Sequence, residues 1–401
     1  MTLKTTLAAV ALATTAMSPV LAQDEPLRLL VLDDMTGIYS GNGGPNTLRA
    51  VEMAVEDFGG EVLGRPIEVI SADHQNKPDV GSALAQQFID EQNVVAMTLG
   101  GSSAVGLAAQ ARAGEEGVIT LVSGGYAPNF SGDQCTPYSF HWAPTTRELA
   151  RGVAGAVVEQ GGDSWYLITP DYVFGHALAA DATAAVEAAG GSVVGETVHP
   201  LNTNDMASAL LSAQGSGAKV FGLANAGTDL ETTIKQAGNF GLSDHLAAML
   251  VFANNVQALG LEQAQNIRMA TSFYWDLNDE TRAFGERIME MNGGEVPTMG
   301  HAGAYSAVTH YLNAVREAGT VDADTVTATM KEMPLSDGFY QNASIRENGR
   351  VVYDMLLAEV NTPDESTGPA DIYEIVATIP GDSLFLSAAE SGCPLTADAT
   401  N

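Results

Sequence analysis

Val94-Val95-Ala96-Met97-Thr98-Leu99 is an apolar run that ends in Gly100-Gly101-Ser102-Ser103-Ala104, and the pattern occurs a second time. The second copy reads Val118-Ile119-Thr120-Leu121-Val122 and ends in Ser123-Gly124-Gly125-Tyr126-Ala127-Pro128. Each run predicts a buried strand that ends in a turn. Taken alone, either turn is explained by serine capping and glycine bending. Taken together on neighbouring strands, the two turns predict an anion site, because free N–H groups and a helix dipole face outward there.

Apolar runs and helical periods alternate on both sides of these turns. The expected strands are residues 27–32, 67–72, 94–99, 118–123, 165–169, 192–197, 220–223, 246–252 and 268–273. Strands that alternate with helices predict an α/β fold with parallel, doubly wound sheets. The alternation breaks between residues 126 and 146, where three prolines predict a crossover into a second lobe. Near the end, period-two patterns at residues 338–345 and 351–360 predict a hairpin.

The first 22 residues have the pattern of an export signal. Lys4 precedes a short apolar run, residues 7–16, and Val20-Leu21-Ala22 is a small-residue cleavage site. The run is too short for a membrane anchor and is broken by Ser18-Pro19. We expect an exported chain that begins at Gln23. Its length suits two lobes, which we place at residues 23–145 with 277–335 and at residues 146–276 with 336–380, followed by a tail at 381–401.

The charge of the chain excludes some partners. Its 49 acidic residues against 17 basic ones give a net charge of −32 at pH 7. Such an excess disfavours binding to nucleic acid and to anionic membrane surfaces. It also repels an anionic ligand at long range, so that local hydrogen-bond donors must hold any carboxylate.

The chain has two cysteines, Cys135 and Cys393. Export permits a disulfide between them, and the alternative is two buried free thiols. We expect the disulfide, because Cys393 lies in a polar tail that little else would hold in place. No His or Asp cluster with metal-ligand spacing lies near either cysteine, and we therefore expect no metal site.

Enzymatic motifs do not follow the predicted strands. The turn at Gly101-Ser102-Ser103 lacks the closing glycine of a nucleophile elbow. No dinucleotide-binding or P-loop glycine pattern opens a helix, and the seven histidines are scattered without zinc spacing. We therefore expect no catalytic residues, no enzymatic activity and no cofactor.

Aromatic residues follow several predicted strands at their carboxyl ends, where open α/β sheets bind ligands. They are Tyr39, Tyr126, Tyr172, Phe174, Phe252, Tyr274 and Trp275. An aromatic residue of the core would lie within a strand, which favours a cleft position for Tyr126, Tyr172 and Phe174. Asp171 would either orient a ligand hydroxyl or cap the helix that follows it.

Several of these segments resemble one family, in order along the chain. They are Leu30-Val31-Leu32-Asp33-Asp34-Met35-Thr36-Gly37, the helix at residues 50–57, Gly101-Ser102-Ser103, Ala127-Pro128, Tyr172-Val173-Phe174-Gly175 and the late Phe339 and Glu347-Asn348-Gly349 hairpin. They resemble the type I periplasmic solute-binding proteins of ABC importers, the Leu/Ile/Val-binding group. The resemblance covers essentially the whole chain after the signal. It implies two lobes, joined by a three-strand hinge, that close on a small ligand.

The resemblance also implies the ligand and the partner. Amino-acid binders of the group supply an acid near residues 252–255, whereas Phe252-Ala253-Asn254-Asn255 has none. The blocks at residues 172–176, 199–203, 223–227 and 272–278 resemble the branch that imports aromatic carboxylates. We therefore expect a monomeric periplasmic receptor that delivers a small carboxylate, best an aromatic acid, to an ABC permease in the inner membrane. The expected ligand contacts are Tyr39, Gly101, Ser102, Ser103, Gly124, Gly125, Tyr126, Tyr172, Phe174, Asn225, Ala226 and Phe252.

Three alternatives stay open at this point. In the first alternative, the chain serves the same kind of importer, but its ligand is a branched-chain or other aliphatic amino acid. The chain would instead be a sensor subunit that docks a membrane receptor without transport. The third alternative, an exported hydrolase, is disfavoured by the lack of a catalytic triad.

Overall fold

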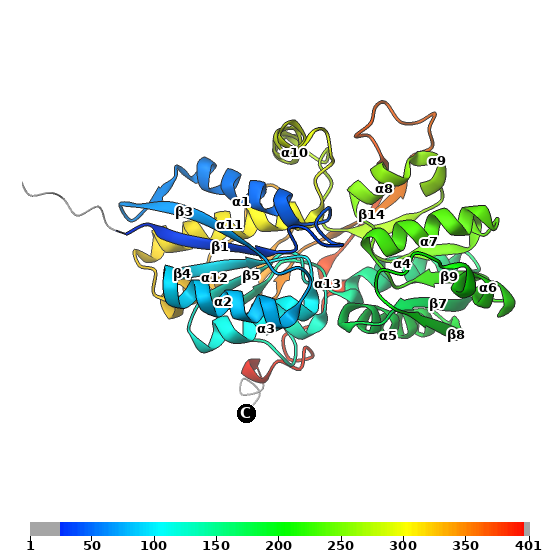
Figure 1. The fold of residues 1–401 in the computed structure, drawn as a ribbon, viewed down its shortest axis with the longest axis horizontal. Helices are drawn as coiled ribbons and strands as arrows, with labels where there is room; N and C mark the ends of the chain where they lie inside the picture. The colour runs from blue at the N-terminus through cyan, green and yellow to red at the C-terminus, as the bar shows by residue number, and fades with distance from the viewer. Residues whose placement is uncertain (1–24, 397–401) are drawn as a thin grey trace, which may run out of the picture.

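The chain folds into two α/β lobes that lie side by side, as Figure 1 shows. This computed structural model describes residues 25–396. The expected export signal at residues 1–22 lies outside the described residues. Among the described residues, no helix has the length and apolar character needed to cross a membrane.

The first lobe is built on a six-stranded sheet with the order β2-β3-β1-β4-β5-β6. Its strands are parallel except for the short β2, which pairs antiparallel with β3. They span β1 Leu27–Asp33, β2 Glu61–Val62, β3 Arg65–Asp73, β4 Val94–Leu99, β5 Ile119–Val122 and β6 Ser139–His141. The helices packed around this sheet are α1 Gly44–Phe58, α2 Pro78–Gln92, α3 Ser103–Glu115, α10 Asp279–Asn292, α11 Met299–Ala318 and α12 Ala323–Glu332.

The second lobe combines a parallel four-stranded sheet, β10-β9-β7-β8, with an antiparallel three-stranded sheet, β11-β14-β15. The strands are β7 Ser164–Pro170, β8 Ser192–His199, β9 Val220–Leu223, β10 Leu246–Ala248, β11 Arg268–Thr271, β14 Met355–Val360 and β15 Tyr373–Ile379. The helices are α4 Thr146–Glu159, α5 Val173–Ala188, α6 Ala207–Gly215, α7 Gly227–Asn239, α8 Ala253–Leu259, α9 Leu261–Ala264 and the short α13 Gly381–Leu384. The expected α/β fold with doubly wound parallel sheets is confirmed.

The chain passes between the lobes three times: between β6 and α4, between β11 and α10, and between β13 (Val351–Val352) and β14. A buried ion pair joins two of these passages, because Arg350 Nη2 lies 3.3 Å from Glu148 Oε2. Arg350 also donates to the carbonyl oxygens of His141 and Ala143. The Tyr353 hydroxyl donates to Trp142 O at 2.6 Å. These bonds fix the connecting segments to one another at the hinge.

The late hairpin differs from its prediction. β12 Ser344–Ile345 pairs with β13 Val351–Val352, but β14 leaves the hairpin and pairs with β11 and β15. The predicted strand at residues 351–360 is broken at Asp354, which accepts hydrogen bonds from Gly381 N and from the Asn342 amide. Arg350 forms an isolated bridge with His141, and β12 contacts α12 of the first lobe. The lobe boundaries assigned by residue number stay a prediction.

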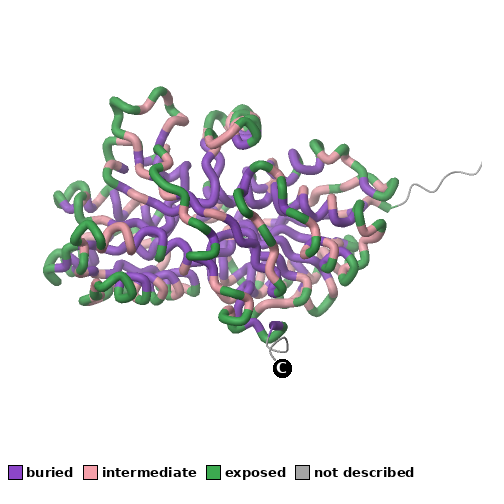
Figure 2. The backbone as a smooth tube through the Cα atoms, turned by 180° about the vertical axis from the view of Figure 1, so that it is seen from behind, coloured by how far each residue is buried: buried purple, intermediate pink, exposed green. Residues whose placement is uncertain are grey.

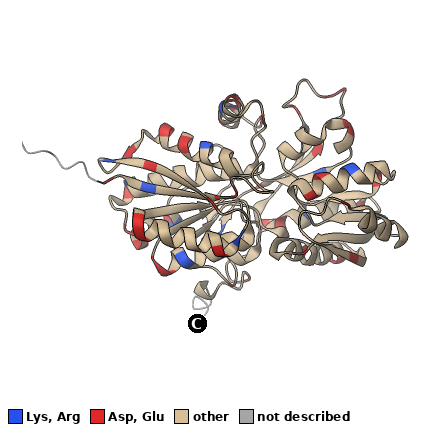
Figure 3. Ribbon diagram, in the orientation of Figure 1, with Lys and Arg blue, Asp and Glu red and all other residues tan. Residues whose placement is uncertain are grey.

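Buried and charged residues follow the two-lobe plan. Buried segments run through the centre of each lobe and through the passages between them, as Figure 2 shows. Asp and Glu residues are spread over the outer helices (Figure 3). A disulfide joins Cys135 of the first lobe to Cys393 of the C-terminal segment. That segment follows α13, which packs against α4 of the second lobe.

Candidate functional site

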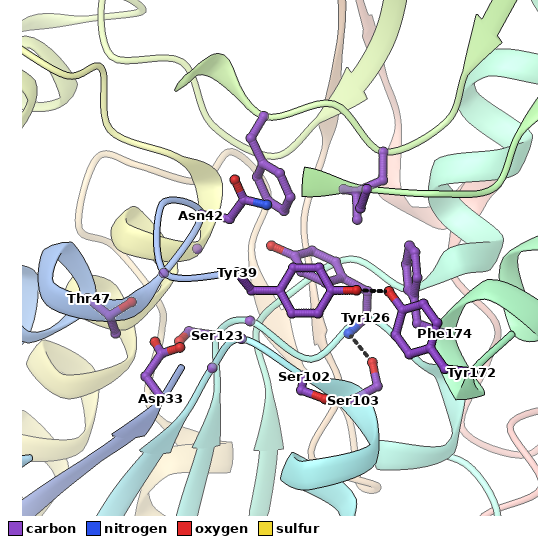
Figure 4. Close-up of a pocket in the computed structure, with 18 residues that line it drawn as sticks. Asp33, Tyr39, Asn42, Thr47, Ser102, Ser103, Ser123, Tyr126, Tyr172 and Phe174 are labelled. Carbon is purple, nitrogen blue, oxygen red and sulfur yellow. Dashed lines mark hydrogen bonds between the residues drawn. The ribbon is translucent and has the colours of Figure 1, made fainter. Parts of the chain in front are cut away.

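A pocket lies between the lobes, where the carboxyl ends of strands from both sheets meet (Figure 4). All but two of the expected ligand contacts line it. Gly125 instead packs against Phe130, and its carbonyl oxygen bonds to His141 Nε2. Asn225 is buried and donates to the Thr233 hydroxyl. The lining residues are Asp33, Tyr39, Asn42, Gly43, Thr47, Gly100, Gly101, Ser102, Ser103, Ser123, Gly124, Tyr126, Tyr172, Phe174, Ala226, Leu250, Phe252 and Gly300.

The turn after β4 presents free hydrogen-bond donors. Gly101 has φ +69°, a left-handed conformation that suits glycine, and it turns the chain into α3. Ser102 precedes the helix with extended backbone and caps no N–H group with its side chain. Its hydroxyl is buried and has no hydrogen-bond partner. A buried hydroxyl next to the first N–H groups of a 13-residue helix can hold an anion.

The turn after β5 uses its donors within the protein. The N–H groups of Tyr126 and Ala127 both donate to Ser103 Oγ at 3.1 Å. The N–H groups of Ser123 and Gly124 both point to Leu99 O, also at 3.1 Å. A Cβ at Gly124 would lie 2.9 Å from Gly100 Cα, so that the two turns touch through backbone. The second turn therefore offers fewer free N–H groups to an anion than the sequence pattern indicates.

Aromatic rings from both lobes form the rest of the wall. Tyr126 of the first lobe lies edge-on to Phe174 and Phe252 of the second, with ring centroids 6.4 and 5.7 Å apart. The Tyr39 and Tyr172 hydroxyls meet across the pocket at 2.5 Å. Burial raises the pKa of Tyr39, Tyr126 and Tyr172, so these phenols stay neutral at ordinary pH. The pocket has a cavity volume of about 30 Å³, which is room for water rather than for a ring, so a ring-sized ligand requires the pocket walls to lie farther apart than they do here.

Amide side chains of α8 form a cross-lobe clasp outside the pocket. We use this name for Asn254, Asn255 and Gln257 with their partners in the first lobe. Asn254 Nδ2 donates to Gly41 O at 2.7 Å and to Glu295 Oε1 at 3.1 Å. Gln257 bonds to the backbone of residues 294 and 296. The amides bond to backbone groups and to the Glu295 carboxylate, so none of these contacts is an ion pair.

The first-lobe side of the clasp, the loop at residues 39–44, is held by α11. The Thr298 hydroxyl donates to Asn42 O at 2.9 Å. His301 Nδ1 accepts from Thr298 N, which leaves Nε2 as the protonated nitrogen that faces Gly43 O at 3.2 Å. Burial lowers the pKa of His301 to about 4, so the imidazole is neutral above that pH. The loop is therefore fixed on its own lobe before it meets the other.

Sequence reasoning missed part of the wall. Asp33 and Gly100 stand at strand ends, in segments that the carboxyl-end rule selects, but neither was among the expected ligand contacts. Asn42, Thr47 and Gly300 follow no strand, and only the approach of the 39–44 loop, α1 and α11 brings them to the pocket. Among the described residues, no group of three or more His, Cys, Asp or Glu could hold a metal ion. The arrangement can grip and enclose a small molecule, and it shows no nucleophile paired with a base.

Comparisons with known proteins agree with this geometry. The model of the family described as periplasmic binding protein matches residues 26–368. The structure is similar to that of a periplasmic binding protein from Burkholderia mallei, with 42% identity, a TM-score of 0.89, and coverage of 92% of this chain and 99% of the other. It is also similar to a branched chain amino acid ABC transporter periplasmic ligand-binding protein from Burkholderia xenovorans, with 32% identity, a TM-score of 0.82, and 92% and 99% coverage.

A third structure shares the fold at lower identity. It is an ABC transporter solute-binding protein from R. palustris in complex with benzoate, with 19% identity, a TM-score of 0.81, and 92% and 99% coverage. No curated protein sequence matched the chain.

Proposed function

The chain belongs to the periplasmic binding protein family, whose solved relatives are solute-binding proteins rather than enzymes, and on that premise we propose that it captures a small aromatic carboxylate for an ABC importer. The family implies a periplasmic location, a small-molecule ligand and a permease partner. The ligand's identity, the monomeric state and cleavage after Ala22 belong to the proposal.

The observation that carries the proposal is the pairing of a partner-free serine hydroxyl with rings from both lobes. Ser102 offers its hydroxyl beside the start of α3, and Tyr126, Phe174 and Phe252 stand edge-on around the same space. The donors suit a carboxylate. The rings suit a flat apolar body, because aromatic pairs favour edge-to-face and offset contacts. In the R. palustris protein the same fold holds benzoate.

Lobe closure would complete the grip. The cross-lobe clasp is a set of contacts between the lobes, and it forms only when the lobes meet. A ligand that touches both walls favours this closed state over the open one, and its binding energy shifts the population toward closure. The closed form would then be the one that docks on the permease.

An aliphatic amino acid is the second candidate ligand. The B. xenovorans relative is named for branched chain amino acids. In addition, the pocket wall includes the carboxylate of Asp33, the type of group that could meet an ammonium. The first candidate is favoured because rings make up much of the wall.

A thermal-shift comparison separates the two candidates. We expect benzoate-type acids to raise the Tm of the wild-type protein more than leucine or isoleucine does, because only the acids fill the ring-lined space. A larger shift with leucine would replace the first candidate by the second. Benzamide is the matched control, since it keeps the ring but lacks the carboxylate, and it should give a smaller shift than benzoate.

A further inference from the structure

One carboxylate in the pocket wall has an oxygen without a partner. Asp33 ends β1 and is only 1% exposed. Its Oδ1 accepts from Asp34 N at 2.7 Å, whereas its Oδ2 is buried and has no hydrogen-bond partner. No lysine, arginine or histidine is among the described residues that line the pocket. A buried anionic oxygen without a donor is costly, so the position calls for a partner.

Glycines on three sides surround this carboxylate. A Cβ at Gly100 would lie 2.1 Å from Oδ2, and a Cβ at Gly43 would lie 2.8 Å from it. A Cβ at Gly101 would lie 2.7 Å from Oδ1. The room for the carboxylate therefore depends on glycine at these positions.

The backbone acceptors around Asp33 are already bonded. Gly43 O faces His301 Nε2, and Asn42 O accepts from the Thr298 hydroxyl. Gly100 O faces both His74 Nε2 and Ser102 N. Among these acceptors, Asp33 Oδ2 is the one without a partner. A hydroxyl brings one donor to one acceptor, whereas an ammonium brings three donors and would leave others unsatisfied in a dry site.

We propose that Asp33 is a second polar contact for the ligand and that it accepts a hydrogen bond from a ligand hydroxyl. The ligand class is then a hydroxylated carboxylic acid. This inference rests on the proposed function, in which the Ser102 turn holds the carboxylate. Figure 4 shows Asp33 on the side of Thr47, away from Ser102 and Ser103, so that two ends of one molecule would reach the two contacts. The O–H···O⁻ bond is charge-assisted, which makes it stronger than a neutral bond.

The test measures a ratio of affinities by calorimetry on the full mature chain. The probes are benzoate, its three hydroxy isomers and the three matching methoxy acids, which keep the oxygen but lose the donor. We expect one hydroxy isomer to bind the wild type about tenfold or more tightly than benzoate, and its methoxy partner to lose that advantage. Asp33→Asn should reduce the ratio to about twofold or less, because the amide lacks the charge. Ser102→Ala is the matched control, and it should weaken all the acids together and keep the ratio.

Each outcome is decisive. Hydroxy and methoxy acids that bind the wild type equally well would overturn the inference without any variant, even if Asp33→Asn did not fold. An Asp33→Asn protein that keeps the wild-type ratio would also overturn it, even if its affinities for benzoate and hydroxybenzoate had both fallen by the same factor. The proposed function survives these results as long as benzoate binds. Failure of every acid to bind the folded wild type would overturn both.

Discussion

The turn after β4 and the turn after β5 lie against each other, but they use their polar groups in different ways. The first leaves the Ser102 hydroxyl without a partner in the pocket wall. The second directs the N–H groups of Tyr126 and Ala127 to Ser103 Oγ. One turn therefore leaves a hydroxyl free in the pocket wall, and the other uses its N–H groups to hold the first in position.

The difference follows from what comes after each turn. The first turn opens α3, a helix of 13 residues whose N–H groups and dipole point toward the pocket. The second opens only η1, the three-residue 3₁₀ helix Pro128–Phe130, which begins with a proline that has no N–H group. Turns of similar composition thus use their polar groups in opposite ways, because only the turn after β4 is followed by a long helix.

Replacing Ser103 should have the largest effect on stability. Ser103→Ala removes the acceptor of two buried N–H groups, and we expect the free energy of unfolding to fall by about 2 kcal/mol or more. Urea denaturation measures the change. Ser102→Ala is the control in the same turn, and it should leave stability nearly unchanged because its hydroxyl has no partner. Equal losses in the two variants would show that the turns do not differ in this way.

Replacing Ser102 should have the larger effect when binding is measured, which reverses the order of the two variants in stability. Ser102→Ala removes a hydroxyl donor from the pocket, and we expect the affinity for an aromatic acid to fall about tenfold. Calorimetry with benzoate checks this value. An unchanged affinity would mean that the carboxylate is held elsewhere in the pocket, and the contrast between the turns would lose its functional meaning.

A smaller effect is expected at the cross-lobe clasp, whose α8 amide residues do not line the pocket. Asn254→Ala removes bonds to Gly41 O and Glu295, and it should weaken every acid by a similar factor of about two to five, because it lowers only the population of the closed state. Calorimetry with several acids measures the factor. Asn266→Ala is the control, since Asn266 bonds to Asp244 within the second lobe. A factor that varied strongly from acid to acid would place Asn254 in ligand selection instead.

The smallest expected effect concerns Asp33, whose carboxylate adjoins the turn after β4. Burial raises the pKa of Asp33 above its ordinary value of 3.8, and the nearby His74 opposes this rise only in part. A raised pKa means that ionisation costs folding energy: the cost is absent below pH 3.8, grows as the pH rises and is complete above the folded-state pKa. Asp33→Asn should therefore raise the Tm of the ligand-free protein at pH 7, and the gain should vanish toward pH 3.5. A gain that is the same at both pH values would contradict this assignment.

Much of the fold could be predicted because its signals are local. The alternation of apolar runs and helical periods predicts β1, β4, β5, β7 and β9 near their observed bounds. The two-residue β2, the three-residue β6 and the edge strand β15 were missed, because short or polar strands carry little periodicity. The hairpin was wrong in both strands. Of the predicted first strand, residues 338–345, only the two residues of β12 form a strand, and the predicted second strand is divided between β13, which pairs with β12, and β14, which pairs with β11 and β15.

The location of the pocket followed from the sequence, but the use of its groups did not. Glycine and serine after consecutive apolar runs are enough to place a site at the carboxyl ends of the strands. Nothing in those residues tells which hydroxyl is free, because Ser102 and Ser103 are adjacent and chemically alike. Only the approach of the second turn to within bonding distance of Ser103 separates them.

The sequence by itself determined the α/β alternation, the two lobes and the strand ends that face the pocket, because these depend on neighbours within a few residues. The tertiary structure alone decided the meeting of Tyr39 with Tyr172, the cross-lobe clasp and the isolation of Asp33 Oδ2. Each of these depends on residues that are far apart in the chain and meet only in the folded protein. Their chemistry depends on distance and burial, which are set only when both lobes are packed.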